Sequence, residues 1–343
     1  MSEPTSKGDA AGSFRSHANY LRAFANAADF DGLHFLKGLT NVASRAKVSL
    51  PADTRPAGSD LDQVHKSLLN AWGTEIILGT SSMFIIDDEL KRLSNNWAVV
   101  QAYYVLYHAT QALAASKGMT RPQNHQPTQR LYGDFWLHQR FDLAPWTVGH
   151  GSSGCVNLPS GATIDEKIHP WTGCSVDNRM SLACLALRTT RQEEVSSALK
   201  RARELRQTAN RKAWKEDEQL RLASGKRSRS EPSFPLPRLD ALERQKVENK
   251  IRPFGLIDYL YRLRIKANYV DVSTFTDGPE DTSSSSAVNS DLRYLVASSM
   301  LVHELRISAL VGQKQMYQWM DSWLRANSAP QMKMGLVQRR GLI

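Results

Sequence analysis

Arg264 is the residue of this sequence best placed to hold an anion. It lies in the segment Leu260–Asp271, LYRLRIKANYVD. On a helix, apolar residues at spacings of four and three would form a buried stripe made of Leu256, Leu260, Leu263, Ala267 and Val270. Arg264 falls beside this stripe, with Asn268 one turn later, and a guanidinium at the edge of a core can bind a phosphate through two parallel hydrogen bonds. The alternative is an ion pair between Arg264 and a carboxylate such as Asp258 or Asp271.

The most apolar stretch of the sequence lies well before this segment. Ala98–Ala115, AVVQAYYVLYHATQALAA, is apolar nearly all the way round, which predicts a central helix. The whole helix is expected from about Asp87 to Lys117, because Gly118 suits the position after a helix end. Its alanines allow close approach of neighbouring helices and its three tyrosines fill volume, so plain core packing explains every residue in it.

The remaining pattern predicts an all-α protein with an irregular insertion, because no stretch alternates with period two for long. We expect a disordered tail over 1–15, an N-terminal helical extension over 16–82, a bundle formed by 83–135 and 254–312, and a C-terminal helix and tail over 313–343. The insertion, 136–253, begins irregular and then carries helices at 180–223 and 239–250 that could form an antiparallel hairpin. A low-complexity loop is expected at 273–290.

Together, the two segments resemble the HEPN domain superfamily. The pattern Ala102-Tyr-Tyr-x-x-Tyr-His-Ala-x-x-Ala-Leu113 is similar to the first long helix of that family, and Leu260–Asp271 is similar to a later one that reads Leu-Tyr-x-x-Arg-x-x-Ala-Asp-Tyr-x-Asp. Both occur in the expected order. The resemblance implies a HEPN-like up-and-down helical bundle interrupted by a large insertion.

The resemblance also implies a site. Many HEPN proteins are metal-independent ribonucleases, in which an arginine is followed four to six residues later by a histidine and two copies meet across a dimer. Arg264 matches the arginine, but Tyr269 occupies the histidine position. An unperturbed tyrosine, with a pKa of about 10, is a poor general base at neutral pH. It can still position a 2′-hydroxyl or stack on a base.

If the chain cleaves RNA, another imidazole has to replace the missing one. We consider His108, on the first segment, and His303, on the last bundle helix. His108 can equally be a hydrogen-bonded core imidazole. His303 shares a helix face with Arg306, three residues later, which is also what a surface or interface pair would look like.

The net charge of +10 is concentrated in the insertion, because Lys200 to Arg229 hold eleven basic and four acidic residues. Such a surplus favours a polyanionic partner, although an exposed helix can be basic for solubility alone. The candidate nucleic-acid-binding residues are Lys200, Arg201, Arg203, Arg206, Arg211, Lys212 and Arg227. Contacts of this kind position a backbone without reading sequence. Trp214 lies among these charges and either stacks on a base or fills the hairpin core.

Three cysteines do not make a secreted disulfide scaffold, and they favour a reducing compartment such as the cytoplasm. His150, Cys155, His169 and Cys174 repeat an x4 spacing that could close a zinc site, but ordinary loop residues explain them as well. Phosphate-loop, nucleophile-elbow and zinc-protease motifs are absent from the sequence, so we expect no cofactor and no metal. No stretch predicts a signal peptide or a membrane span.

The first hypothesis is therefore a HEPN-like protein that acts on RNA, with Arg264, Asn268 and Tyr269 at a cleft, working as a homodimer in antiviral defence or a toxin-like stress response. The second is a non-catalytic dimerisation or scaffold module that binds nucleic acid or a partner protein of the same system.

Overall fold

The computed structural model describes residues 7–51, 54–84, 87–139, 142–270, 272–279, 282–327 and 334–343. These residues form helices and one short β-hairpin, which confirms the predicted all-α class. One hydrophobic core contains side chains from both ends of the chain and from the first turns of the insertion helix. The helices before residue 82, predicted as an extension, contribute to this same core.

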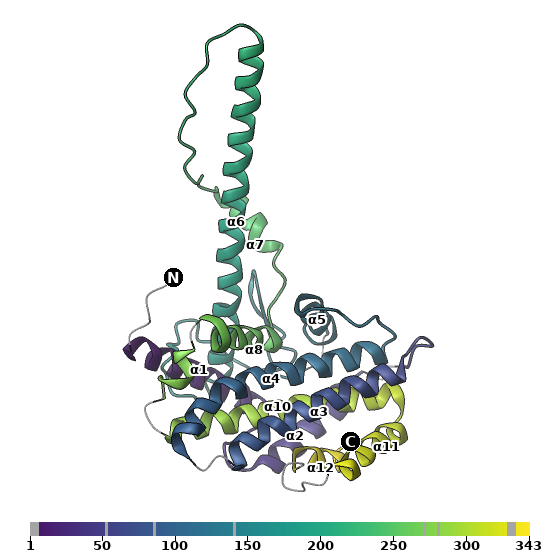
Figure 1. Cartoon of the computed structure of the whole chain (residues 1–343). Helices are drawn as coiled ribbons and strands as arrows, with labels where there is room; N and C mark the ends of the chain where they lie inside the picture. Colours follow the sequence, from purple (N-terminus) through teal and green to yellow (C-terminus); the bar gives the residue numbers. More distant parts are fainter. Residues whose placement is uncertain are drawn as a thin grey trace.

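Two long helices, α4, Asp88–Ser116, and α10, Thr282–Val311, lie at the centre of the bundle and pack against each other (Figure 1). Helix α4 also packs against α3, Leu61–Phe84. Asp87 caps α4 by accepting a hydrogen bond from the Leu90 amide at 2.8 Å, and Gly118 has a positive φ of 70° just beyond its end. The helix predicted from about Asp87 to Lys117 is thus confirmed. Helices α1, Lys7–Ala27, and α2, Phe35–Ser49, also pack on α10.

Helix α10 is apolar enough to raise the question of a membrane. Among the described residues, Ser283–Val311 has the length and composition of a spanning helix, but 94% of its most apolar stretch is buried inside the bundle. That burial is what the core helix of a soluble protein shows.

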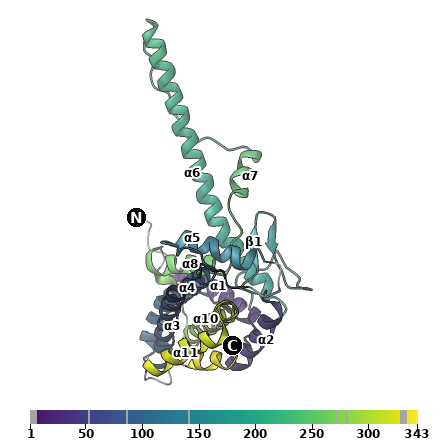
Figure 2. The same cartoon turned by 90° about the vertical axis from the view of Figure 1, so that its right-hand side faces the viewer.

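The insertion carries a long helix that projects from the bundle (Figures 1 and 2). Helix α6, Arg179–Ala223, has 45 residues and a length of about 67 Å at 1.5 Å per residue. Its first turns are buried in the core, whereas most of its outer half is exposed. The chain returns without helix to α7, Ala241–Asn249, which packs on α6. The two predicted helices of the basic hairpin are present, but most of the return is not helical. We call this projecting part, 196–240, the stalk.

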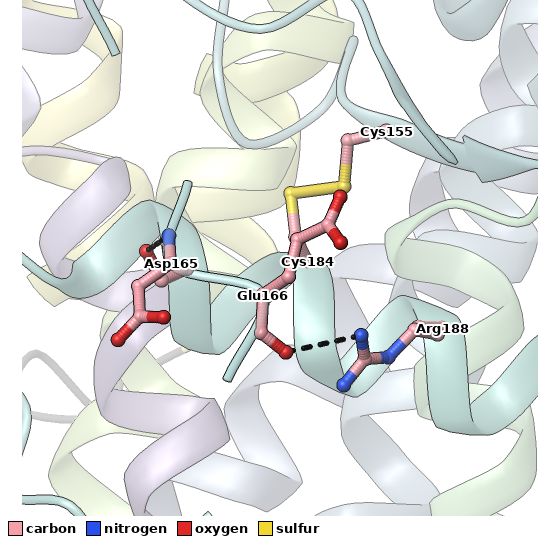
Figure 3. Close-up of a disulfide and its surroundings, with 6 residues drawn as sticks. Cys155, Asp165, Glu166, Cys184 and Arg188 are labelled. Atoms are coloured by element: carbon pink, nitrogen blue, oxygen red, sulfur yellow. Dashed lines mark hydrogen bonds between the residues drawn. A yellow bond between two sulfur atoms is a disulfide. The ribbon is translucent and has the colours of Figure 1, made fainter. Parts of the chain in front are cut away.

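A β-hairpin and a disulfide tie the root of the stalk to the bundle. Strands β1, Gly149–Gly151, and β2, Gly154–Val156, are antiparallel, and His150 also pairs with Phe254. Cys155 on β2 is joined to Cys184 on α6, beside Glu166 and Arg188 (Figure 3). The Arg188 guanidinium donates a hydrogen bond to the Glu166 carbonyl at 3.3 Å. The disulfide was not expected from a cysteine count that favoured reduced thiols.

Three predicted boundaries near the chain ends were wrong. Residues 7–15, predicted as part of a disordered tail, belong to α1, where Phe14 packs edge-on against Phe275; residues 1–6 lie outside the described residues. The predicted loop 273–290 contains α9, Ser273–Thr276, and the first turns of α10, because Ser285 and Val288 are buried in the fold. The basic C-terminus, after α11, Gln313–Ala326, ends in α12, Met334–Arg340.

Candidate functional site: an arginine and a histidine among tyrosines

The two segments that suggested a site lie side by side. Helix α8, Leu256–Ile265, packs on α4, and the guanidinium of Arg264 donates a hydrogen bond from Nη2 to Tyr104 Oη at 3.1 Å. The buried stripe predicted for α8 is confirmed, because Leu256, Leu260, Leu263 and Ala267 are all buried. Arg264 is therefore held at the edge of the core by the helix that the sequence placed next to it.

Aromatic rings surround the guanidinium of Arg264. Its carbon atom Cζ lies 5.2 Å from the ring centre of Tyr104 and 5.7 Å from the ring centres of Tyr103 and Tyr261. Each ring presents π-electron density that attracts the cation. These contacts orient the guanidinium plane. The hydrogen bond to Tyr104 uses only one of its N–H donors.

A histidine that sequence reasoning missed completes the cluster. His125 is the first residue of α5, His125–Tyr132, and its Nδ1 lies 2.8 Å from Tyr103 Oη. Its ring is 5.4 Å from Tyr261 and 5.2 Å from Tyr107, centre to centre. Burial and, second, the positive charge of Arg264 lower the pKa of His125 below its usual 6.5. His125 is partly exposed and is thus a neutral imidazole beside a cation at neutral pH. We call Tyr103, Tyr104, Tyr107, His125, Tyr261 and Arg264 the tyrosine cluster.

The carboxylates that could have neutralised Arg264 are engaged elsewhere or not described. Asp258 is buried, accepts a hydrogen bond from Arg252 Nη1 at 2.9 Å, and also accepts one from the Gly255 amide at 2.9 Å. Asp271 lies outside the described residues. Within the described part of the chain, Arg264 forms no ion pair, and its Nε has no hydrogen-bond partner. This Nε is buried, and an anion bound to the guanidinium would displace no acid among the described residues.

The predicted catalytic role of His303 was wrong. Its side chain is completely buried, with Nδ1 2.7 Å from the Ser299 carbonyl, and its Nε2 accepts a hydrogen bond from Trp136 Nε1 at 3.3 Å. Burial lowers the pKa of His303 to about 4. Arg306 donates to the Phe135 carbonyl within the same packed region. This pair is part of the core, and the surface position considered as the alternative is also wrong.

His108 lies at the margin of the tyrosine cluster and is not its base. Its ring is 6.2 Å from that of Tyr104, and burial, followed by the charge of Arg121, lowers the pKa of His108 to about 4. Within the described residues, Nδ1 of His108 has no hydrogen-bond partner. A base with so low a pKa removes protons weakly, so His125 is the better imidazole.

The last turn of the second segment departs from regular α-helix. Lys266–Val270 form a π-helical turn, η2, which holds Asn268 and Tyr269 and packs on α4. The wider turn rotates these residues away from the register expected for an α-helix. Tyr269 is 71% exposed and makes no ring contact with the tyrosine cluster among the described residues, whereas Asn268 is half-buried. Sequence spacing therefore placed Arg264 correctly relative to the core but did not bring Tyr269 to it.

The basic residues of the stalk are mostly paired with acids. Arg201 binds Glu194 at 2.7 Å, and Arg206 binds Glu243 at 2.7 Å. Similar pairs hold Arg211 with Glu231, Lys200 with Glu204, and Lys212 with Glu216. Arg203 and Arg227 are the two predicted nucleic-acid-binding residues without an ion pair in the described part of the chain. Trp214 packs on Phe234 and under Arg229 inside the hairpin, as its packing interpretation expected. These pairs are solvent-exposed, and the segment from Lys200 to Arg229 keeps its surplus of basic residues.

The four residues considered for zinc are not gathered. Cys155 is in the disulfide, Cys174 accepts a hydrogen bond from Asn26 at 3.4 Å, and His169 accepts one from the Trp171 amide at 3.2 Å. No group of three or more potential metal ligands occurs among the described residues.

Comparison of the chain with protein-family models, with curated proteins and with solved structures found no match.

Proposed function

We propose that this chain is an RNA-acting protein whose tyrosine cluster cleaves RNA without a metal ion, with Arg264 as the phosphate ligand and His125 as the general base. The proposal rests mainly on one observation. Arg264, which has no acid partner among the described residues, contacts Tyr104, and the neutral, partly exposed His125 contacts the adjacent Tyr103. The sequence resemblance to HEPN ribonucleases supports the same chemistry. His125 takes the role that Tyr269 cannot fill.

The cleavage step follows from these two groups. In the tautomer with a proton on Nδ1, His125 donates to Tyr103 Oη and keeps a lone pair on Nε2. This nitrogen takes the proton of a ribose 2′-hydroxyl, whose oxygen attacks the adjacent phosphorus. The P–O5′ bond breaks, the leaving oxygen takes a proton from water, and the products are a 2′,3′-cyclic phosphate and a 5′-hydroxyl. Arg264 stabilises the added negative charge on the phosphoryl oxygens.

The position of His125 adds a second source of positive potential. It begins α5, and the side chain of Asn124 makes no capping hydrogen bond to the first turn. Uncapped amides at a helix start favour an anion. Pro127 removes one of the first-turn donors, which leaves the amides of His125 and Gln126 at the start of the helix.

The test incubates the purified chain with mixed cellular RNA in EDTA and identifies the product ends. Cleavage that persists in EDTA and leaves 2′,3′-cyclic phosphate supports the proposal. Products with 3′-hydroxyl ends, or activity restored only by a divalent cation, would refute it. Arg92→Ala serves as a matched arginine control, since Arg92 lies on α4 and pairs only weakly with Glu89 at 3.8 Å.

A second candidate is a non-catalytic scaffold that dimerises or docks a partner protein. The observation in its favour is the stalk, where Leu205, Leu220 and Leu236 are each more than half exposed. The stripe Leu90, Leu93 and Trp97 on the first turns of α4 is also exposed and suits the homodimer that the resemblance implies. A scaffold would keep its oligomeric state in Arg264→Ala and would never cleave RNA. Antiviral defence or a toxin-like stress response is the setting that the family resemblance suggests for either role.

A further inference from the structure

A cleft of about 930 Å³ opens at the root of the stalk. Its walls come from α5, from the first exposed turns of α6, from the segment 250–254 and from α8. Tyr261 belongs both to this cleft and to the tyrosine cluster, so the cleft borders the cluster at Tyr261, whose ring contacts Arg264 and His125. Its volume is that of a site for a short ligand segment.

Three of the four acids that line the cleft pair with arginines, and the fourth, Asp134, lies beside His138, which is charged only when protonated. Glu193 pairs with Arg262, and Asp258 pairs with Arg252. Glu194 pairs with Arg201 at 2.7 Å, and Asp134 lies 3.2 Å from His138. Two exposed cations of the lining, Arg130 and Lys250, form no ion pair among the described residues. The uncompensated charge of the cleft is therefore positive.

Hydrogen-bond donors without partners also line the cleft. Gln129 is only 6% exposed, and its amide nitrogen Nε2 has no hydrogen-bond partner in the described part of the chain. The Nε of Arg262 is also buried and has no hydrogen-bond partner among the described residues. A buried donor without an acceptor is unfavourable, and a ligand oxygen that binds it removes this cost. The cleft thus combines free cations, free donors and the aromatic faces of Phe254 and Tyr261.

We propose that this cleft binds single-stranded RNA and delivers the scissile phosphate to the tyrosine cluster. Arg130 and Lys250 contact backbone phosphates, Gln129 donates to a base or sugar oxygen, and unstacked bases lie on the two aromatic rings. Single strands expose the base faces that such rings bind, whereas a duplex hides them. This inference rests on the proposed function for its choice of RNA as the polyanion.

The test is direct binding to a fluorescent, 2′-O-methylated single-stranded RNA, which lacks the attacking hydroxyl and stays intact. Anisotropy is measured at several salt concentrations. In Arg130→Ala/Lys250→Ala, the affinity falls about tenfold, and the slope of log K against log salt flattens by about 1.4 for two lost phosphate contacts. Gln129→Met weakens binding without changing the slope, because the amide is neutral. The matched control is Lys215→Ala/Lys226→Ala on the stalk, which leaves affinity unchanged within about twofold, because both lysines are exposed and neither lines the cleft.

The outcomes separate this inference from the proposed function. If the wild type never cleaves RNA but its RNA affinity depends on Arg130 and Lys250, the proposed cleavage activity is refuted and the proposed RNA-binding role of the cleft is supported. Equal losses of RNA affinity in the cleft and stalk variants, or no RNA binding by the wild type, would refute the proposal that the cleft binds RNA. A duplex of equal charge or a poly-glutamate that competes as well as the single strand overturns the choice of single-stranded RNA.

Discussion

Tyr103 Oη and His125 Nδ1 lie 2.8 Å apart, although 22 residues separate them in the chain. Tyr103 is buried in the centre of α4, and burial raises the pKa of its hydroxyl far above its ordinary value. It therefore remains a phenol and acts as a fixed hydrogen-bond partner. This contact orients the imidazole and, by holding Nδ1, leaves Nε2 for substrate.

Tyr103→Phe keeps the ring beside Arg264 and removes only the hydroxyl that orients His125. We expect cleavage to slow by about fivefold, the effect of one net hydrogen bond of roughly 1 kcal/mol. The Michaelis constant should change little, because the hydroxyl touches His125 and not RNA. Tyr132→Phe is the control, since that hydroxyl donates to the Trp146 carbonyl within the core. Equal slowing in both variants would indicate general destabilisation.

The pH dependence of cleavage should report His125. The general base must be neutral, so the rate rises with pH and levels off above the pKa of His125, which lies below 6.5. Because the positive charge of Arg264 disfavours the imidazolium, Arg264→Ala should raise the pKa of His125. Histidine ring resonances followed by NMR over about pH 5 to 8 give this pKa without any need for activity. A pKa of His125 that is unchanged in Arg264→Ala would place the two groups outside electrostatic reach.

The Cys155–Cys184 bond should contribute to stability. It closes a loop with a sequence separation of 29, for which the loss of unfolded-state entropy predicts about 3–4 kcal/mol. Urea unfolding with and without a thiol reductant measures the difference. Cys184→Ser should remove the effect of the reductant, whereas Cys174→Ser should keep it, because Cys174 is outside the bond. Identical unfolding of the wild type with and without reductant would mean that the thiols are already reduced.

Neighbouring arginines near the C-terminus should differ sharply in their effect on stability. Arg339 is fully buried and bonds to Glu304 at 2.7 Å and to Glu75 at 2.7 Å. Arg339→Met leaves two acids without their cation and should lower the free energy of unfolding by about 3–5 kcal/mol. Arg340→Met breaks an exposed pair with Asp321 and should change it little. Urea unfolding of the two variants under the same conditions provides the comparison; similar losses would contradict the buried network.

Local patterns predicted the elements that form the scaffold of the site. The apolar run with Asp87 before it and Gly118 after it predicted α4, and the 4-3-4-3 stripe predicted the buried face of α8 and the place of Arg264 beside it. The contact between the two segments was expected only from the resemblance, and the Arg264–Tyr104 hydrogen bond is consistent with it.

The rest of the site depends on contacts between residues far apart in the sequence, and the local spacing of apolar residues does not predict them. His125 follows a proline-containing loop and reaches Tyr103 only because α5 folds back on α4, so spacing drew attention to His108 and His303 instead. The π-turn of Lys266–Val270 moved Tyr269 out of its α-helical register. The partners of the stalk arginines could not be predicted either, because acids as distant in sequence as Glu231 and Glu243 pair with them.

The most direct test of the account is single-turnover cleavage of one RNA by the wild type and by Arg264→Ala, His125→Ala and the exposed-histidine control His34→Ala. We predict a loss of about a hundredfold or more in each of the first two variants, the usual contribution of a general base or a charge-stabilising donor. The control should retain wild-type activity, because His34 is exposed, pairs with Asp31 and is not a residue of the tyrosine cluster. Cleavage by His125→Ala at the wild-type rate, with correctly folded protein, would contradict the claim that this imidazole and Arg264 form one active site.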